Sequence, residues 1–142
     1  MKKGATALTE SWPALEEVSN NHLMLGHIME WFYTGLAGIK QEENSVAFKN
    51  IIIRPEIVGD ITWVKSSYQS SYGLIRSDWK KEQNILEMKV EIPSNTSATI
   101  YLPTNQEGSV TENGNKTNVL KTADGNCFCK VGSGSYVFRV NY

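Results

Sequence analysis

Four side chains that could take part in chemistry lie close together near the N-terminus. They are Glu10, Trp12, His22 and His27. A carboxylate and an imidazole can each accept or donate a proton, and an indole ring can pack against a ligand. Taken by itself, Glu10 is typical of a solvated surface acid, because glutamate is rarely buried without a partner. His22 is compatible with a histidine at a helix end that has no chemical role.

Two cysteines, Cys127 and Cys129, are the thiol groups of the chain. On a strand, residues two positions apart point to the same face, and this arrangement disfavours a disulfide between them. No further Cys or His lies nearby at the spacing of a metal site. We therefore expect two small buried thiols, and neither a metal nor a cofactor.

Four aromatic residues in the middle of the chain suggest a second kind of site. They are Trp63, Tyr68, Tyr72 and Trp79. They could line a sugar-binding surface, because aromatic faces and sugars complement each other. Aromatic residues also dominate the burial of apolar area, so packing in a core or between domains is the interpretation that we favour.

The composition is typical of a globular chain that buries a core. The chain has 142 residues, 40% of them hydrophobic, and a net charge of −1. This charge gives no support for nucleic acid or a membrane surface as a partner. The apolar stretch Leu23–Ile39 is interrupted by His27, Glu30 and Thr34, so we predict no membrane-spanning helix. The N-terminus lacks the apolar core of a signal peptide.

The residues after Asn20 and Asn21 predict one long helix over residues 21–39. Asn is a favourable N-cap, and Gly35 and Gly38 mark the C-terminal end. Apolar side chains fall on nearly every face of this helix: Leu23, Met24, Leu25, Ile28, Met29, Trp31, Phe32 and Leu36. A helix that is apolar all round is a buried helix, and the rest of the chain supplies no comparable helix to cover it. We infer that its partners are missing.

Beyond a polar segment, 40–45, that reads as a linker, the chain has the pattern of short strands and turns. The expected strands include 46–53, 61–69, 74–81, 85–92, 98–102 and 136–140. Residues 85–92 alternate between apolar and polar side chains, which indicates one buried and one exposed face. Asn113-Gly114 and Asp124-Gly125 are tight-turn signals. The sequence therefore predicts a mainly β chain, an antiparallel β-sandwich of about eight strands preceded by one apolar helix.

Several motifs resemble bacterial α-L-rhamnosidases of glycoside hydrolase family 78. GATALTESW is similar to the family motif GAT-x-x-x-E-x-W, and SNNHLMLGHIMEWFYTGLAGI is similar to the family helix that contains N-H, EW and LAGI. The resemblance continues to the end of the chain through FKNIIIRPEI, ITWVKSSYQSSYGLIRSDW, VEIPSNTSATIYLP, VTENG and VGSGSYVFRV. It therefore covers nearly the whole chain in order.

The resemblance implies two domains. Residues 1–40 would be the end of an (α/α)₆ catalytic barrel, a loop and its last helix, and residues 46–142 would be the C-terminal β-sandwich. The missing barrel would then pack on the helix at 21–39, and in its absence this helix could drive self-association. The implied substrate is a rhamnose-containing glycan or glycoside. The sequence leaves the location open, and a periplasmic or extracellular location is favoured over a cytoplasmic one.

The resemblance also implies roles for individual residues. Such enzymes release terminal α-L-rhamnose with inversion, which uses two carboxyl groups about 6.5–9.5 Å apart. Glu10 aligns with the general base that activates water, His22 with a histidine that contacts the sugar, and Trp12 with an aromatic residue near the pocket. Thr9 stands where the family often has tryptophan, and the loop from Glu10 to His22 is short, so the pocket shape differs from the common pattern.

The general acid of the family lies upstream of these motifs, so we expect the fragment alone to be inactive. The alternative is a non-catalytic module, either a carbohydrate-binding or a structural β-sandwich. A self-contained module would have no use for an all-round apolar helix preceded by a glutamate motif, and this favours the enzyme fragment.

Overall fold

The computed structural model describes residues 9–10, 19 and 21–141 of the chain. It forms two compact units, Met1–Phe32 and Tyr33–Tyr142. The first unit contains most of the helical segment, and the second contains every strand of the described residues. Each unit is described by itself below.

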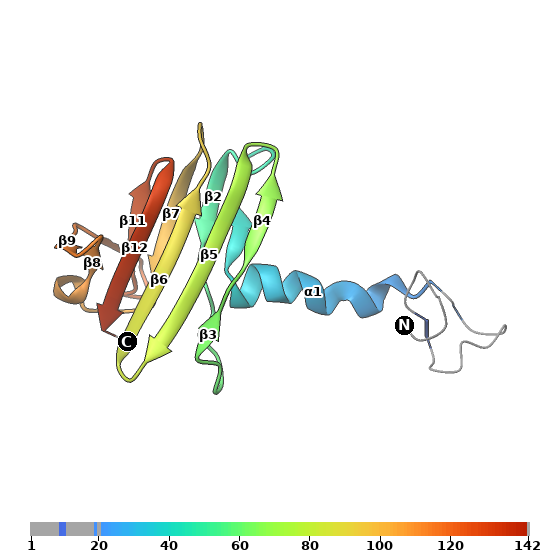
Figure 1. Cartoon of the computed structure of the whole chain (residues 1–142), viewed down its shortest axis with the longest axis horizontal. Coiled ribbons are helices and arrows are strands. Elements are labelled where there is room, and N and C mark those ends of the chain that lie inside the picture. Colours follow the sequence, from blue (N-terminus) through green and yellow to red (C-terminus); the bar gives the residue numbers. More distant parts are fainter. Residues whose placement is uncertain (1–8, 11–18, 20, 142) are drawn as a thin grey trace. The chain divides into compact units, whose positions relative to one another are not determined.

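The second unit is built from two β-sheets that lie in two layers, as Figure 1 shows. The five-stranded sheet, in the order β1-β2-β7-β11-β10, contains β1 (Ile39–Gln41), β2 (Asn50–Ile53), β7 (Ser97–Leu102), β11 (Cys127–Val131) and β10 (Leu120–Lys121). The seven-stranded sheet, in the order β3-β5-β6-β12-β8-β9 with β4 paired to β5, contains β3 (Trp63–Val64), β4 (Ser67–Ser70), β5 (Gly73–Glu82), β6 (Ile85–Ile92), β8 (Thr111–Glu112), β9 (Asn115–Lys116) and β12 (Gly134–Asn141). A short 3₁₀ turn, η3 (Glu107–Ser109), precedes β8.

The predicted antiparallel sandwich is confirmed. All strand pairs of the described residues are antiparallel except β2 and β7, which run parallel with Asn50 opposite Ser97. Four of the twelve strands, β3, β8, β9 and β10, have only two residues. The other eight are the longer strands and agree with the predicted number of about eight.

The core lies between the two sheets, and β6 shows how the sequence specifies it. Leu86, Met88, Val90 and Ile92 are each at most 2% exposed, while the residues between them are less buried. The predicted alternation over 85–92 is therefore confirmed. The opposite sheet contributes its own inward row, which includes Ile51, Ile53, Ala98, Ile100, Leu102 and Cys127. Burial of these apolar side chains is the main favourable term for the sandwich.

Both cysteines belong to this core. Cys127 and Cys129 are buried and carry free thiols, as predicted from their spacing on one strand. Burial raises the pKa of the Cys129 thiol to about 12, and burial also raises the pKa of Cys127. Because the thiolate is the reactive form, these residues act as small apolar groups.

The helical segment is shorter than the predicted helix over 21–39. It consists of a 3₁₀ turn, η1 (Leu23–Gly26), a short α-helix, α1 (His27–Trp31), and a π-helical turn, η2 (Phe32–Leu36). The prediction was wrong at the C-terminal end, where Ile39 already begins β1 and pairs with Ile53. The expected linker at 40–45 was wrong for the same reason, because its first two residues belong to β1. A local helical pattern carries no information on this long-range pairing.

The predicted asparagine cap also differs from the structure. His22 is the N-cap residue of η1, and its side chain makes no capping hydrogen bond. The backbone carbonyl of Asn21 accepts a hydrogen bond from the Leu23 amide at 3.2 Å. Asn20 lies outside the described residues.

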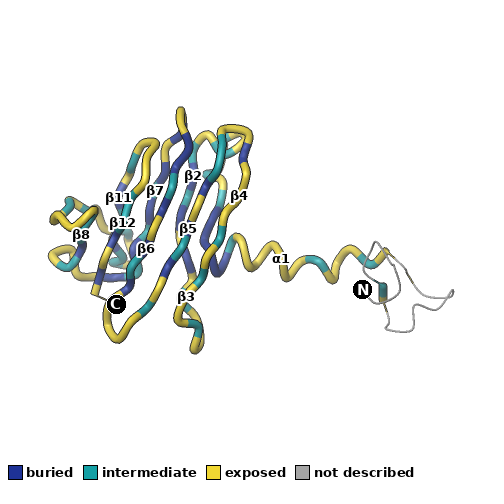
Figure 2. Tube along the Cα trace, viewed as in Figure 1, coloured by how far each residue is buried: buried dark blue, intermediate teal, exposed yellow. Residues whose placement is uncertain are grey.

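Apolar side chains of the helical segment are exposed, although the sequence pattern is that of a buried helix. Leu23, Met24, Ile28 and Met29 are between 53% and 75% exposed, and the exposed colour of Figure 2 runs along most of α1. Burial begins only at Gly35, in the second unit. No helix of the described residues is long and apolar enough to cross a membrane.

The end of the helical segment is fastened to the sandwich by four consecutive backbone carbonyls, at residues 35–38. Each accepts one hydrogen bond from a group of the same compact unit: Gly35 from the Glu56 amide at 3.0 Å, Leu36 from Trp79 Nε1 at 2.8 Å, Ala37 from Ser77 Oγ at 2.6 Å, and Gly38 from the Arg54 amide at 2.9 Å. The last carbonyls of a helix have no partner within the helix, so the sandwich supplies the missing donors. We call this set of contacts the junction.

Gly38 is required where the junction approaches the segment after β2. Its φ angle is +71°, and a Cβ added there would lie 2.1 Å from the carbonyl carbon of Arg54. Such a position combines left-handed backbone with a close backbone approach, and both demand glycine.

We expect Gly38→Ala to destabilise the chain by more than about 3 kcal/mol, because it adds a steric overlap to backbone strain. The measurement is urea-induced unfolding followed by circular dichroism. Gly59→Ala is the matched control, since Gly59 has a φ of +57° but no atom within 4 Å of the added Cβ. The control should cost only about 1 kcal/mol. Equal losses for the two variants would contradict the account of the junction.

Candidate functional site

Glu10 is held by two hydrogen bonds to Ser19. Its backbone amide donates a hydrogen bond to the Ser19 carbonyl at 2.8 Å. The Ser19 amide in turn donates to Glu10 Oε2 at 3.1 Å. Glu10 is exposed, and the Ser19 amide holds one of its two carboxylate oxygens. This arrangement is compatible with a solvated surface acid. It is equally compatible with a general base whose general-acid partner lies outside this chain.

The other N-terminal candidates are placed only in part. His22 is half-buried at the start of η1, and its backbone carbonyl accepts a hydrogen bond from Leu25 at 3.2 Å. His27 is exposed at the start of α1. Trp12 lies outside the described residues. Within the described ranges, no group of three or more His, Cys, Asp or Glu side chains could hold a metal ion.

The four central aromatic residues do not form one surface. Trp79 is 2% exposed and belongs to the core, where its indole donates to the junction. Tyr68 packs against Phe48, with ring centroids 4.8 Å apart. Tyr72 lies beneath the Lys49 ammonium, 5.3 Å from the ring centroid. Trp63 is 59% exposed. Packing is therefore the right interpretation for Trp79, and Trp63 is available to a ligand.

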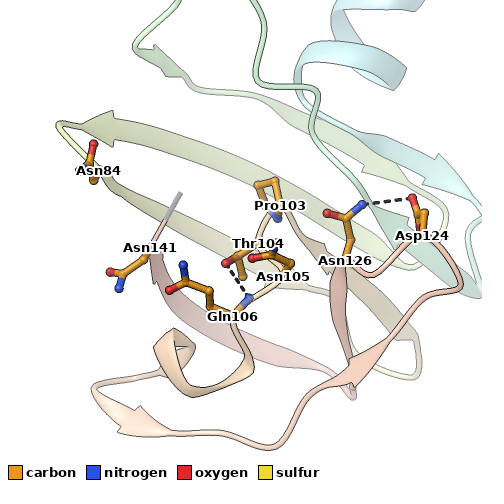
Figure 3. Close-up of a pocket in the computed structure, with 8 residues that line it drawn as sticks. All are labelled: Asn84, Pro103, Thr104, Asn105, Gln106, Asp124, Asn126 and Asn141. Carbon is orange, nitrogen blue, oxygen red and sulfur yellow. Dashed lines mark hydrogen bonds between the residues drawn. The ribbon is translucent and has the colours of Figure 1, made fainter.

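A polar cleft lies where several turns of the sandwich meet, and Figure 3 shows its lining. Its volume is about 640 Å³, and it is lined by Asn84, Pro103, Thr104, Asn105, Gln106, Asp124, Asn126 and Asn141. The Asn126 amide donates to Asp124 at 3.1 Å, and hydrogen bonds from Thr122 and Asn126 lower the Asp124 pKa, as do its own backbone amide and the nearby Arg54. No aromatic residue lines this cleft, and most of its lining side chains are carboxamides. Such a lining is better suited to bound water than to a ligand with apolar faces.

A second groove, of about 590 Å³, surrounds Trp63 on the outer face of the seven-stranded sheet. It is lined by Trp63, Val64, Lys65, Arg76, Asp78, Trp79, Lys80, Glu87 and Lys89. We call it the Trp63 groove. This groove was not predicted from the sequence, although the alternation of Arg76, Asp78 and Lys80 along one strand is a signal for an outward-facing charged row. The register that places Trp63 opposite Lys80 is not readable from that alternation.

Glu87 is one of the two carboxylates that line this groove, together with Asp78. Arg139 donates to Glu87 Oε2 through Nε and Nη2, both at 2.7 Å, and Lys89 lies 3.3 Å from Oε1. The hydrogen bond from Arg139 is the largest cause that lowers the pKa of Glu87. This carboxylate is therefore already neutralised by two cations.

Two mainly antiparallel sheets around one apolar core place the chain among the β-sandwich proteins. Residues 38–117 match the family described as bacterial α-L-rhamnosidase C-terminal domain. The match covers more than half of the chain, and the chain belongs to this family.

Curated relatives and solved structures agree with this assignment. An α-L-rhamnosidase of Streptomyces avermitilis is 26% identical over 97% of the chain, and one of Formosa agariphila is 36% identical over 72%. The structure of an α-L-rhamnosidase from Dictyoglumus thermophilum superposes over 99% of the chain, with a TM-score of 0.81 and 30% identity. The chain spans only 14% of the Streptomyces relative, 11% of the Formosa relative and 17% of the Dictyoglumus chain.

Proposed function

We propose that the chain is the C-terminal portion of an inverting α-L-rhamnosidase that hydrolyses terminal α-L-rhamnosyl residues of glycans or glycosides. Family membership and the small share of each relative that the chain spans support this proposal. A solved relative from Streptomyces avermitilis is complexed with L-rhamnose, at 26% identity and a TM-score of 0.80. The same matches favour an enzyme portion over a free-standing sandwich module.

Glu10 is the general base of this proposal. The observation that carries it is an exposed carboxylate that the Ser19 amide orients through one oxygen. The second oxygen could then take a proton from a water molecule that attacks the anomeric carbon from the side opposite the leaving group. The protonated acid that assists the leaving group belongs to a preceding part of the enzyme. His22 would contact the bound sugar, and Trp12 would stand near the pocket.

The proposed domain arrangement explains the exposed helical segment. Residues 1–40 would be the end of an (α/α)₆ barrel, and residues 46–142 the sandwich that follows it. The apolar side chains of η1 and α1 would then pack against other barrel helices, because an exposed apolar patch of this kind normally marks an interaction surface.

The chain alone should not hydrolyse rhamnosides, since one carboxylate can supply the base but not the acid. The measurement is release of 4-nitrophenol from 4-nitrophenyl α-L-rhamnoside by the purified chain at high protein concentration. Release above the uncatalysed rate would refute our proposal that this chain supplies the general base and another part of the enzyme supplies the general acid.

In the longer enzyme, Glu10→Gln should lower kcat by about 100-fold to 10,000-fold, because a carboxamide cannot accept the proton of water. KM should change little if the carboxylate acts mainly in the transition state. Glu43→Gln, at an exposed position of the sandwich, is the matched control and should keep full activity.

Two further observations separate a base from a merely structural glutamate. Glu10→Ala with added azide should form a glycosyl azide of inverted configuration, because the anion attacks the anomeric carbon without needing a base while the leaving group departs with the proton of the acid. The wild-type enzyme should first release β-L-rhamnose, seen by NMR. A kcat within a few-fold of wild type for Glu10→Gln would rule out the assignment.

The isolated chain should self-associate through the exposed apolar side chains of its helical segment. Its mass, measured by light scattering after gel filtration, should rise with concentration, and the double variant Met24→Glu/Ile28→Glu should restore the monomer. Val46→Glu is the control, because Val46 is 77% exposed but lies outside the helical segment. A monomeric wild-type chain at high concentration would argue against this proposal.

A further inference from the structure

Trp63 is the most exposed aromatic side chain of the part of the chain that the structure describes. Its exposed fraction is 59%, whereas Tyr68, Tyr72 and Trp31 lie between 38% and 40%. It stands on β3, at the edge of the seven-stranded sheet next to β5 (Figure 1). Tryptophan is highly buried on average, so an indole ring left open to this degree is available for contact with a ligand.

The surroundings of the indole are charged rather than apolar. Six of the nine residues that line the Trp63 groove carry a charge: Lys65, Arg76, Asp78, Lys80, Glu87 and Lys89. The cores of protein–protein interfaces are depleted in charged residues, so this surrounding does not fit a docked protein surface. It fits a ligand that has an apolar ring face and a polar rim, as a pyranose ring has.

Some of these charges are already satisfied, and the remainder decide which ligand suits the groove. Glu87 is paired with Arg139 and Lys89, and Lys80 is paired with Glu82. Lys65 and Arg76, in contrast, form no ion pair with any described residue, although Asp78 and Glu87 line the same groove. An acidic group on the ligand could form charge-assisted hydrogen bonds with these two cations without displacing an existing ion-pair partner.

The groove is also held in shape before any ligand binds. The Ser66 amide donates to Asp78 Oδ1 at 3.1 Å, which fixes one carboxylate oxygen and leaves the other for a ligand hydroxyl. Behind the groove, Val64 pairs with Trp79, whose indole is anchored to the Leu36 carbonyl. A site that is ordered in advance loses less conformational entropy on binding.

We propose that the Trp63 groove binds an acidic oligosaccharide: one pyranose ring stacks on Trp63, its hydroxyls bond to Asp78, and a uronic acid carboxylate meets Arg76 and Lys65. The groove volume of about 590 Å³ lies within the usual range of ligand sites. The site would hold a substrate chain without cleaving it. It belongs to the second compact unit, and it does not depend on the role of Glu10.

The test is isothermal titration calorimetry on the full chain. The probe is an oligosaccharide of alternating L-rhamnose and galacturonic acid, and the neutral comparison is a rhamnose oligosaccharide of equal length. The acidic probe should bind saturably, at least about tenfold more tightly than the neutral one, and added salt should weaken it. Equal affinity for both probes would overturn the role of Arg76 and Lys65.

Single substitutions then locate the site. Trp63→Ala should weaken binding of the acidic probe at least about tenfold and Trp63→Phe much less, since stacking is the main apolar contact. Arg76→Ala should remove most of the preference for the acidic probe. Tyr72→Ala is the matched control, because Tyr72 is a 39% exposed aromatic residue outside the groove, and this variant should bind as the wild type does.

Thermal unfolding separates lost binding from lost folding. Trp63 and Arg76 are exposed, so their variants should unfold at the wild-type temperature. Absence of saturable heat with the acidic probe, or unchanged affinity in Trp63→Ala, would overturn the proposal. That outcome would instead indicate that the indole packs against another part of a longer chain. Neither result bears on the proposed role of Glu10, which the activity assays on Glu10 variants test separately.

Discussion

The junction is the constraint that fixes the C-terminal end of the helical segment within the second unit. The four backbone carbonyls of residues 35–38 lie at the C-terminal end of the helical segment, where a helix offers them no donor. Each accepts a hydrogen bond from a group of the sandwich. An unsatisfied buried polar group costs about 1–3 kcal/mol, so the set is costly to break. Two donors, Ser77 and Trp79, lie on the inward face of β5. One strand of the core thus also defines where the helix must end.

The sandwich could be predicted from the sequence where local patterns carry the information. The alternation in β6 and the Asn113-Gly114 turn are examples, because each depends on residues that are close in the chain. The start of β1 could not be predicted, since Ile39 is extended only because it pairs with Ile53. The role of Trp79, either packing or contact with a sugar, was equally ambiguous from the sequence. Its sequence context does not say that its indole nitrogen meets a helix end.

The candidate sites show the same limit. Glu10 was singled out through a motif and not through any physical pattern, and the geometry adds the hydrogen bond from the Ser19 amide. The groove around Trp63 was not predicted, because it depends on the register that aligns β3, β5 and β6. Cross-strand neighbours are set by that register, and a slip of one residue would move Trp63 to the opposite face. The aromatic residues could be named as candidates from the sequence, but the charged residues that surround Trp63 could not.

The free thiols of Cys127 and Cys129 have a consequence for how this sandwich assembles. Many small sandwiches join their sheets by a disulfide, whereas here the same core volume is filled by reduced sulfur and aliphatic side chains. Formation of this core therefore needs no oxidant to join two sulfur atoms. The core of the sandwich therefore does not depend on a bond that reducing conditions would break.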